Sequence, residues 1–271
     1  MRIPDILKCI KTESWKRSDD VKAFDLSVGV KTLLKELQVP FDAEAVAKRC
    51  VANPNSKYFG MDWKEVVDSW SRKFDNKCTQ GSTLDDYIGS KLLNFPFDLT
   101  DSDSVLKNQA KQFDRLYDEH LSKLTFIGRE NWLCININKV RIRGKFDALF
   151  GVGNQNDMER ILVIDWKQND KIDMQSNKYL LGPMSKYMDC KHVMMTLQIY
   201  VYRYILETYG VATNGGGIGW ISETDAKLLK LAFPYDSKQI KEVLEWCTIQ
   251  FRNNRNKSQQ DRNNESNNEN K

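Results

Sequence analysis

Two aspartates and one lysine lie near the ends of two neighbouring apolar segments, where the two carboxylates could bind a metal ion with the amine beside it. Asp147 falls in V-R-I-R-G-K-F-D-A-L-F, and Asp165 falls in I-L-V-I-D-W-K, with Lys167 two residues further on. Because side chains of a strand alternate between its two faces, Asp165 and Lys167 are expected to point the same way. Carboxylate oxygens at close quarters favour a hard cation such as Mg²⁺ or Mn²⁺. The D-x-K pattern alone, however, is more often an ordinary ion pair on a hairpin.

The elements that hold these residues are predicted to be two paired strands. Both segments are rich in β-branched residues, and the polar connection G-V-G-N-Q-N-D-M-E-R lies between them. This arrangement is typical of a hairpin with a loop longer than a tight turn. We therefore expect Asp147, near the end of the first strand, to lie beside Asp165 and Lys167 on the second. Further strands are predicted at residues 132–137, 218–222 and 228–233.

Helices are predicted on both sides of this hairpin from apolar residues at three- and four-residue steps. Asp42 and Asp62 precede such patterns and are expected to cap them. On a later helix, Gln198 and Tyr202 share an apolar face, so Gln198 needs hydrogen-bond partners if that face is buried. A core helix with a tolerated glutamine is the alternative interpretation. The predicted helices cover residues 63–74, 84–93, 104–124, 192–210 and 237–251.

The composition carries no strong charge bias. The 271 residues include 41 Lys and Arg against 37 Asp and Glu, which permits a nucleic-acid partner without requiring one. The six cysteines form no C-x-x-C pair, which argues against a zinc site or an iron–sulfur cluster and for reduced thiols. No apolar run is long enough for a membrane span, and no signal-peptide pattern is present. We therefore expect an intracellular protein that does not enter a membrane, in the cytoplasm, the nucleus or a virus-infected cell.

The chain is predicted to have three regions. Residues 1–57 are expected to form an N-terminal helical arm or cap in which no chemistry is visible. Residues 58–251 are expected to form the main domain. Residues 252–271 are rich in Asn, Gln and charged residues, with no large apolar side chain, and are predicted to be disordered.

The order of these motifs resembles that of the PD-(D/E)XK nuclease superfamily, and more narrowly its RecB-like branch of viral and mitochondrial exonucleases. The matching motifs are G-K-F-D at 144–147, D-W-K at 165–167 and Q-I-Y-V-Y at 198–202. The resemblance covers roughly residues 58–220. It implies an α/β fold with a restriction-endonuclease-like core, in which a central mixed β-sheet is flanked by helices, preceded by an N-terminal helical region.

The resemblance also implies a role for each residue of the first two motifs. Asp147 and Asp165 would hold Mg²⁺, for which Mn²⁺ can substitute, and the backbone carbonyl of Trp166 would be a further ligand. Lys167 would orient or help deprotonate the attacking water and offset charge on the phosphate. Glu130 falls where relatives often carry an acid ahead of the central hairpin, and it would support the site from outside the ligand set.

Gln198 and Tyr202 are implied to contact the substrate strand and to support the site. Relatives also carry G-(S/T)-x-x-H, in which the histidine is a metal ligand. This chain has G-S-T-L-D, so that Asp85 takes the place of the histidine and would bind the metal through oxygen. Two further positions depart from the family pattern: Gly89 replaces an acid, and Gln168 replaces the usual threonine after D-x-K.

These implications together describe a metal-dependent nuclease that hydrolyses phosphodiester bonds of DNA. The expected activity is that of an exonuclease or end-processing enzyme in repair, recombination or replication, acting on DNA that is single-stranded or has free ends. One alternative is a catalytically weakened nuclease fold that serves as a nucleic-acid-binding or scaffolding module, because Asp85 replaces the histidine. Another is a protein–protein adaptor without affinity for nucleic acid.

Overall fold

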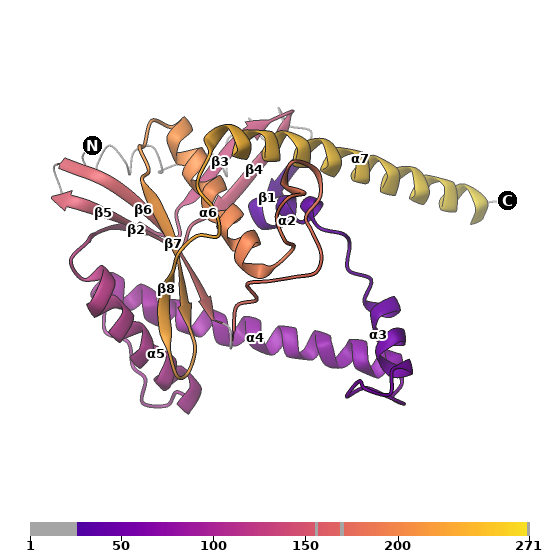
Figure 1. The fold of residues 1–271 in the computed structure, drawn as a ribbon, viewed down its shortest axis with the longest axis horizontal. Coiled ribbons are helices and arrows are strands. Elements are labelled where there is room, and N and C mark those ends of the chain that lie inside the picture. The colour runs from indigo at the N-terminus through magenta and orange to yellow at the C-terminus, as the bar shows by residue number, and fades with distance from the viewer. Residues whose placement is uncertain (1–25, 155–156, 169–170, 270–271) are drawn as a thin grey trace. The chain divides into compact units, whose positions relative to one another are not determined.

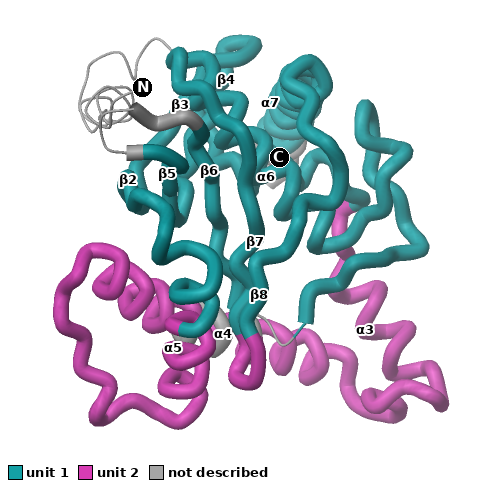
Figure 2. Tube along the Cα trace, turned by 60° about the vertical axis from the view of Figure 1, so that its left-hand side comes forward, with its two compact units in different colours: residues 1–39, 115–221, 226–271 teal, residues 40–114, 222–225 magenta. Residues whose placement is uncertain are grey.

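The computed structural model describes residues 26–154, 157–168 and 171–269 (Figure 1). The chain forms two compact units, drawn in different colours in Figure 2. The larger unit comprises residues 1–39, 115–221 and 226–271, and the smaller comprises residues 40–114 and 222–225. The boundaries predicted from the sequence, after residues 57 and 251, differ from these. The difference arises because the strand at residues 26–29 pairs with a strand more than a hundred residues away.

A five-stranded mixed sheet forms the centre of the larger unit. Its order is β2-β5-β6-β7-β8; β6 and β7 run parallel, and every other neighbouring pair is antiparallel. Helix α6 (Lys191–Thr208) packs against β6 and β7. The predicted fold class, α/β with a central mixed sheet flanked by helices, is therefore confirmed. The strands are β2 (Thr125–Arg129), β5 (Ala148–Asn154), β6 (Asp157–Gln168), β7 (Gly215–Ile221) and β8 (Ala226–Leu229).

A second, three-stranded sheet has the order β1-β4-β3. Strand β1 (Leu26–Gly29) runs parallel to β4 (Val140–Lys145), and β4 runs antiparallel to β3 (Trp132–Ile137). The predicted strand at residues 132–137 is confirmed with the same bounds. The inward side chains of this sheet, such as Leu133 and Ile142, lie in the core of the unit.

The first segment of the predicted hairpin is not one strand, because the chain leaves one sheet and enters the other at Phe146 and Asp147. Between β2 and β3 the chain likewise passes from the five-stranded sheet to the three-stranded sheet, beside Phe146. There Glu130 adopts a left-handed conformation with φ of 50°, and its N–H donates to the Phe146 carbonyl at 3.0 Å. The predicted hairpin is present as β5 and β6, but the long loop predicted at residues 151–160 is wrong, because β5 continues to Asn154 and β6 begins at Asp157. Asp147 therefore lies in the bend between β4 and β5, and not on a strand.

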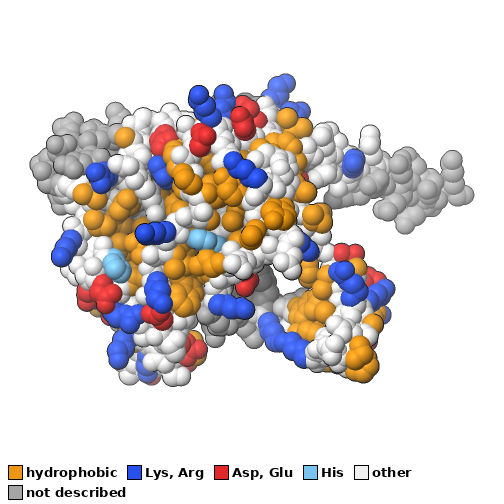
Figure 3. Space-filling view, viewed as in Figure 1, with side chains coloured by type: hydrophobic (Ala, Val, Ile, Leu, Met, Phe, Trp, Pro, Cys, Tyr) orange, Lys and Arg blue, Asp and Glu red, His pale blue; other side chains and the backbone are white. Residues whose placement is uncertain are grey.

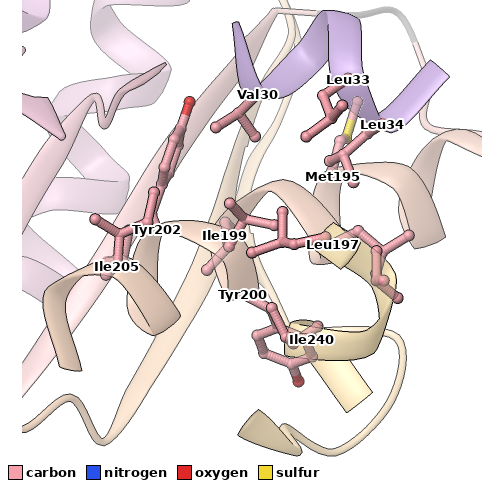
Figure 4. Packing of buried hydrophobic residues seen from close by; sticks show 14 of the residues in the cluster. Val30, Leu33, Leu34, Met195, Leu197, Ile199, Tyr200, Tyr202, Ile205 and Ile240 are labelled. Atoms are coloured by element: carbon pink, nitrogen blue, oxygen red, sulfur yellow. The ribbon is translucent and has the colours of Figure 1, made fainter. Parts of the chain in front are cut away.

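Helix α6 is the centre of the hydrophobic core. Its buried residues include Leu197, Ile199 and Ile205, and burial around most of its circumference is the pattern of a helix enclosed on several sides. Helix α2 (Val30–Leu34) packs against it, as Figure 4 shows. Residues 26–37, which the sequence analysis assigned to an arm or cap, are thus part of the core of the larger unit.

Helix α7 (Ser237–Glu269) continues beyond Phe251, where the sequence analysis ended it, and runs through residues 252–269, which were predicted to be disordered. Its first half buries Val243, Leu244 and Cys247 in the core. Residues 253–260 are exposed. A helix satisfies its backbone hydrogen bonds internally, so a polar segment can extend a helix that is already anchored by packing.

The smaller unit is helical and contains α3 (Ala43–Ala52), α4 (Trp63–Leu92) and most of α5 (Ser104–Leu116). The predicted N-caps are confirmed, since Asp42 accepts from the Ala45 N–H at 2.9 Å and Asp62 from the Lys64 N–H at 3.0 Å. The two helices predicted at residues 63–74 and 84–93 are one continuous helix, α4, which runs through Gly81. A single glycine inside a helix costs only about 1 kcal/mol, which the packing of the helix on both sides can offset.

Two further observations concern the whole described chain. No helix in the described ranges combines the length and apolar character needed to cross a bilayer. On the face drawn in Figure 3, basic and acidic side chains are interspersed, in keeping with the nearly balanced charge of the sequence.

Candidate active site

Asp147, Asp165 and Lys167 come together in the larger unit around one residue of β6. The Asp147 carboxylate accepts a hydrogen bond from the backbone N–H of Trp166 at 2.7 Å. The Lys167 ammonium forms an ion pair with Oδ2 of Asp165 and donates to the Trp166 carbonyl at 3.2 Å. The bend after β4 thus delivers one carboxylate to the point on β6 where the other carboxylate and the amine are located.

Gln198 and Tyr202 support the Asp165 carboxylate from α6. Asp165 has no exposed surface, and its Oδ1 accepts from Nε2 of Gln198 at 2.7 Å. Nε2 of Gln198 also donates to the Tyr202 hydroxyl oxygen at 3.1 Å. Because residues four apart lie on one face of a helix, the Q-x-x-x-Y spacing aims both side chains at the same strand. The buried glutamine therefore has the partners that the sequence analysis required of it.

Gly144 leaves room for the Tyr202 ring. A Cβ atom at position 144 would lie 2.6 Å from Cε1 of Tyr202 and 3.0 Å from a methyl group of Val30. No side chain fits there without moving one of these groups. The glycine of the G-x-x-D motif is thus explained by packing, because it lets α6 bring Tyr202, and with it Gln198, close to β4.

Burial, and after it the neighbouring negative charge of Asp165, raises the pKa of Asp147 to about 7. The Lys167 ammonium, the Trp166 N–H and the charge of Lys31 act against this shift. The cluster contains two carboxylates and a single ammonium, that of Lys167, so it has fewer positive than negative charges when both aspartates are ionised. Such a cluster stabilises a cation that binds to it.

The donor atoms suit a magnesium ion. All the candidate donor atoms are oxygens, from the carboxylates of Asp147 and Asp165 and the carbonyl of Trp166. The Lys167 ammonium already contacts the Asp165 carboxylate and the Trp166 carbonyl, so these two groups accommodate a positive charge. Within the described ranges, no three His, Cys, Asp or Glu side chains converge to form a ligand set. Mg²⁺ commonly binds through one or two carboxylates together with water and substrate phosphates, so two carboxylates are sufficient for it.

Asp85 belongs to the smaller unit, whereas the other predicted site residues belong to the larger one. It is partly buried on α4. The helix predicted at residues 84–93 would put Asp85 near its start, but α4 begins at Trp63 and Asp85 is far from that end. Glu130 pairs with Lys145 at 2.7 Å and therefore belongs to the bend next to the site.

Lys31 is a residue near the site that the sequence analysis did not identify. It is exposed on α2, and its charge acts on the Asp147 carboxylate. No motif marks it. Its position follows from the pairing of β1 with β4, in which Gly29 lies opposite Arg143.

Comparisons with known proteins do not identify a family for this chain. No family model matches it, and no curated protein matches it. Sixteen chains of solved structures match, among them one titled "Crystal structure of SSO0001". That structure is 14% identical, with a TM-score of 0.38, over 90% of this chain and 84% of that chain. A similarity at this level supports no conclusion about function.

Proposed function

We propose that this protein is a metal-dependent nuclease of the PD-(D/E)XK type that hydrolyses phosphodiester bonds in DNA. The observation that carries the proposal is the convergence of Asp147 and Asp165 on the backbone of Trp166, with Lys167 bound to one of the two carboxylates. The order of the three sequence motifs supports it independently. An ordinary surface ion pair would not need a fully buried aspartate held by a buried glutamine.

In the proposed reaction, Asp147, Asp165 and the Trp166 carbonyl hold the ion. When bound, Mg²⁺ would supply Lewis-acid catalysis and neutralise charge at the phosphate. The Lys167 ammonium places fixed positive charge beside the scissile phosphate and orients the attacking water. Gln198 keeps the Asp165 carboxylate in place through its hydrogen bond to Oδ1. The expected substrate is DNA that is single-stranded or has free ends.

Cleavage of labelled DNA tests the proposal. Single-stranded and double-stranded DNA are incubated with the protein and Mg²⁺, Mn²⁺ or a chelator, and products are separated by size. We expect cleavage only with a metal ion, and a loss of roughly a hundredfold or more in the Lys167→Ala variant. Lys241→Ala is a suitable control, because Lys241 is exposed on α7 and forms a local ion pair with Glu245 at 3.8 Å.

The competing functions predict different results in the same experiment. If neither wild type nor Lys167→Ala cleaves DNA with either metal and both bind it equally, the protein is a nucleic-acid-binding module. If neither shows any salt-dependent affinity for DNA, the adaptor hypothesis is favoured, since binding to phosphates weakens with salt.

A further inference from the structure

The outward side of the three-stranded sheet carries a row of cations, and we call its residues on β3 and β4 the basic face. The register pairs β3 and β4 directly, so that residues opposite each other share a side. The other side is in the core, where Leu133 and Ile142 have almost no exposed surface. The basic face consists of Trp132, Cys134, Asn136, Arg141, Arg143 and Lys145.

The basic face carries three positive charges, and β1, β3 and β4 contain no acidic residue. Arg143, in the middle of the row, is exposed, whereas Arg141 is largely buried. Lys145 pairs with Glu130 at 2.7 Å, but its side chain keeps 38% of its surface exposed. The local charge therefore remains positive with Glu130 included, and Arg143 and Lys145 are the cations that a ligand can reach.

The row has a regular spacing and a direction. Alternate residues of a strand are roughly 6.8 Å apart, which is comparable to the distance between consecutive phosphates of an extended nucleic-acid strand. The row ends at Lys145, two residues before Asp147. A strand bound along β4 would therefore run toward the bend that carries Asp147, between β4 and β5.

Trp132 adds an aromatic ring to the end of the row that is nearest the active site. It lies opposite Lys145, whose Nζ is 5.8 Å from the ring centroid, and it is partly exposed. Proteins that bind single strands combine cations along the backbone with aromatic rings on which bases stack. In a duplex the faces of the bases are stacked on each other, so an aromatic ring on an open sheet favours a single strand.

We propose that the basic face binds a single nucleic-acid strand, with Arg143 and Lys145 at consecutive phosphates and Trp132 against a base, and leads that strand to Asp147 and Asp165. The delivery to the active site rests on the proposed nuclease function. The binding itself does not, and it can be measured without metal or cleavage.

The first experiment measures the salt dependence of binding. A labelled oligothymidylate is titrated by fluorescence anisotropy at several salt concentrations, with a chelator present and in the Lys167→Ala background. Each lost phosphate contact lowers the slope of log K against log salt by about 0.7, so the double variant Arg143→Ala/Lys145→Ala should lose about 1.4. Lys241→Ala removes a lysine that also pairs with a glutamate, and it should leave the slope unchanged.

The second experiment tests the aromatic contact. Trp132→Leu should lower the affinity for oligothymidylate and oligouridylate roughly tenfold, and leave the salt slope unchanged, because it removes stacking and no charge. A duplex of the same length should bind more weakly than the single strand. Circular dichroism and thermal melting establish that each variant is folded.

Three results would overturn the inference: an unchanged slope in the double variant, an equal loss in Lys241→Ala, or tighter binding of duplex than of single strand. Its failure is distinguishable from failure of the proposed function. A protein that cleaves DNA but binds equally well without the basic face refutes only the inference. A protein that binds through the basic face and never cleaves refutes only the nuclease.

Discussion

Asp147 and Asp165 are held in different ways, although they converge on the same residue. Asp165 is fully buried and accepts from Gln198, with the Lys167 ammonium on its other oxygen. Asp147 is half-buried in a bend, and the Trp166 N–H donates to one of its oxygens. The charge of Asp147 is therefore sensitive to what binds at the site.

The stability of the metal-free protein should depend on the ionisation of Asp147. Its folded-state pKa, about 7, lies above the ordinary value of 3.8, so the folded protein holds this proton more tightly than the unfolded chain. The contribution of Asp147 to the free energy of unfolding is therefore fully present below pH 3.8, and it is lost as pH rises to about 7. The Asp147→Asn variant should not show this loss.

Urea denaturation with a chelator, repeated across this pH range, measures the effect as the difference between wild type and Asp147→Asn. We expect the difference to move in favour of the variant as pH rises. A difference that stays constant would show that Asp147 ionises as freely in the folded protein as in the unfolded chain.

Gln198 should matter more for activity than for folding. Gln198→Ala leaves Oδ1 of a buried carboxylate without this donor, which should cost about 1–3 kcal/mol while the protein still folds. Because Asp165 is then less well positioned, we expect cleavage to fall at least tenfold. Chemical denaturation and the DNA assay measure the two effects separately.

Tyr202→Phe is the matched control for Gln198→Ala. It keeps the ring that packs at Gly144 and removes only the hydroxyl that accepts from Gln198. Its effects should be smaller than those of Gln198→Ala. Wild-type cleavage rates in Gln198→Ala would mean that the glutamine is only a tolerated residue of a core helix.

At the scale of elements, the site is made by a bend and by a close approach between a helix and a strand. The bend between β4 and β5 moves the chain from one sheet to the other and positions Asp147. The close approach depends on Gly144, over which Tyr202 of α6 packs.

Gly144→Ala should therefore destabilise the protein and lower its activity. The new Cβ would lie 2.6 Å from the Tyr202 ring, and overpacking of this kind costs about 1–3 kcal/mol. Displacement of Tyr202 should also move Gln198 and reduce cleavage. Denaturation and the DNA assay, performed on the same preparation, measure both consequences.

Gly29→Ala on the neighbouring strand β1 is the matched control. A Cβ there would have its nearest contacts at 3.9 Å, so its effect should stay within about 0.5 kcal/mol. Equal behaviour of the two variants would show that the space above Gly144 is not needed.

At the scale of the whole molecule, the candidate metal ligands are divided between the two units. Asp147, Asp165 and Trp166 belong to the larger unit, and Asp85 to the smaller. If Asp85 is a metal ligand, as the sequence resemblance implies, Asp85→Ala should weaken Mn²⁺ binding much more than Asp86→Ala does. Isothermal titration of Mn²⁺ into each variant measures this. Equally small effects would assign Asp85 a structural role on α4.

Local patterns in the sequence predicted many elements and the members of the site. The alternation at residues 132–137 predicted β3 with its exact bounds, and the helical spacing at residues 192–210 predicted α6 to within two residues. The D-x-K and Q-x-x-x-Y spacings predicted which side chains share a face. These features depend on neighbours a few residues apart, so the sequence displays them directly.

Features that depend on distant segments were not predicted. The pairing of β1 with β4 joins residues more than a hundred positions apart, and it brings α2, which carries Lys31, against β4. The continuity of α4 through Gly81 and the extension of α7 to Glu269 likewise have no local signal. In α4, packing outweighs the low helix propensity of glycine, whereas the polar end of α7 extends a helix whose first half is anchored by packing.

By itself, therefore, the sequence determined which residues could do chemistry: two carboxylates, one amine and a supporting glutamine at characteristic spacings. Only the tertiary structure decided how they meet, with Asp147 in a bend between two sheets and Gln198 brought to Asp165 by the space above Gly144. The physical reason is that strand alternation and helical periodicity are local, whereas the convergence of side chains depends on which strands pair and how closely helices pack on them.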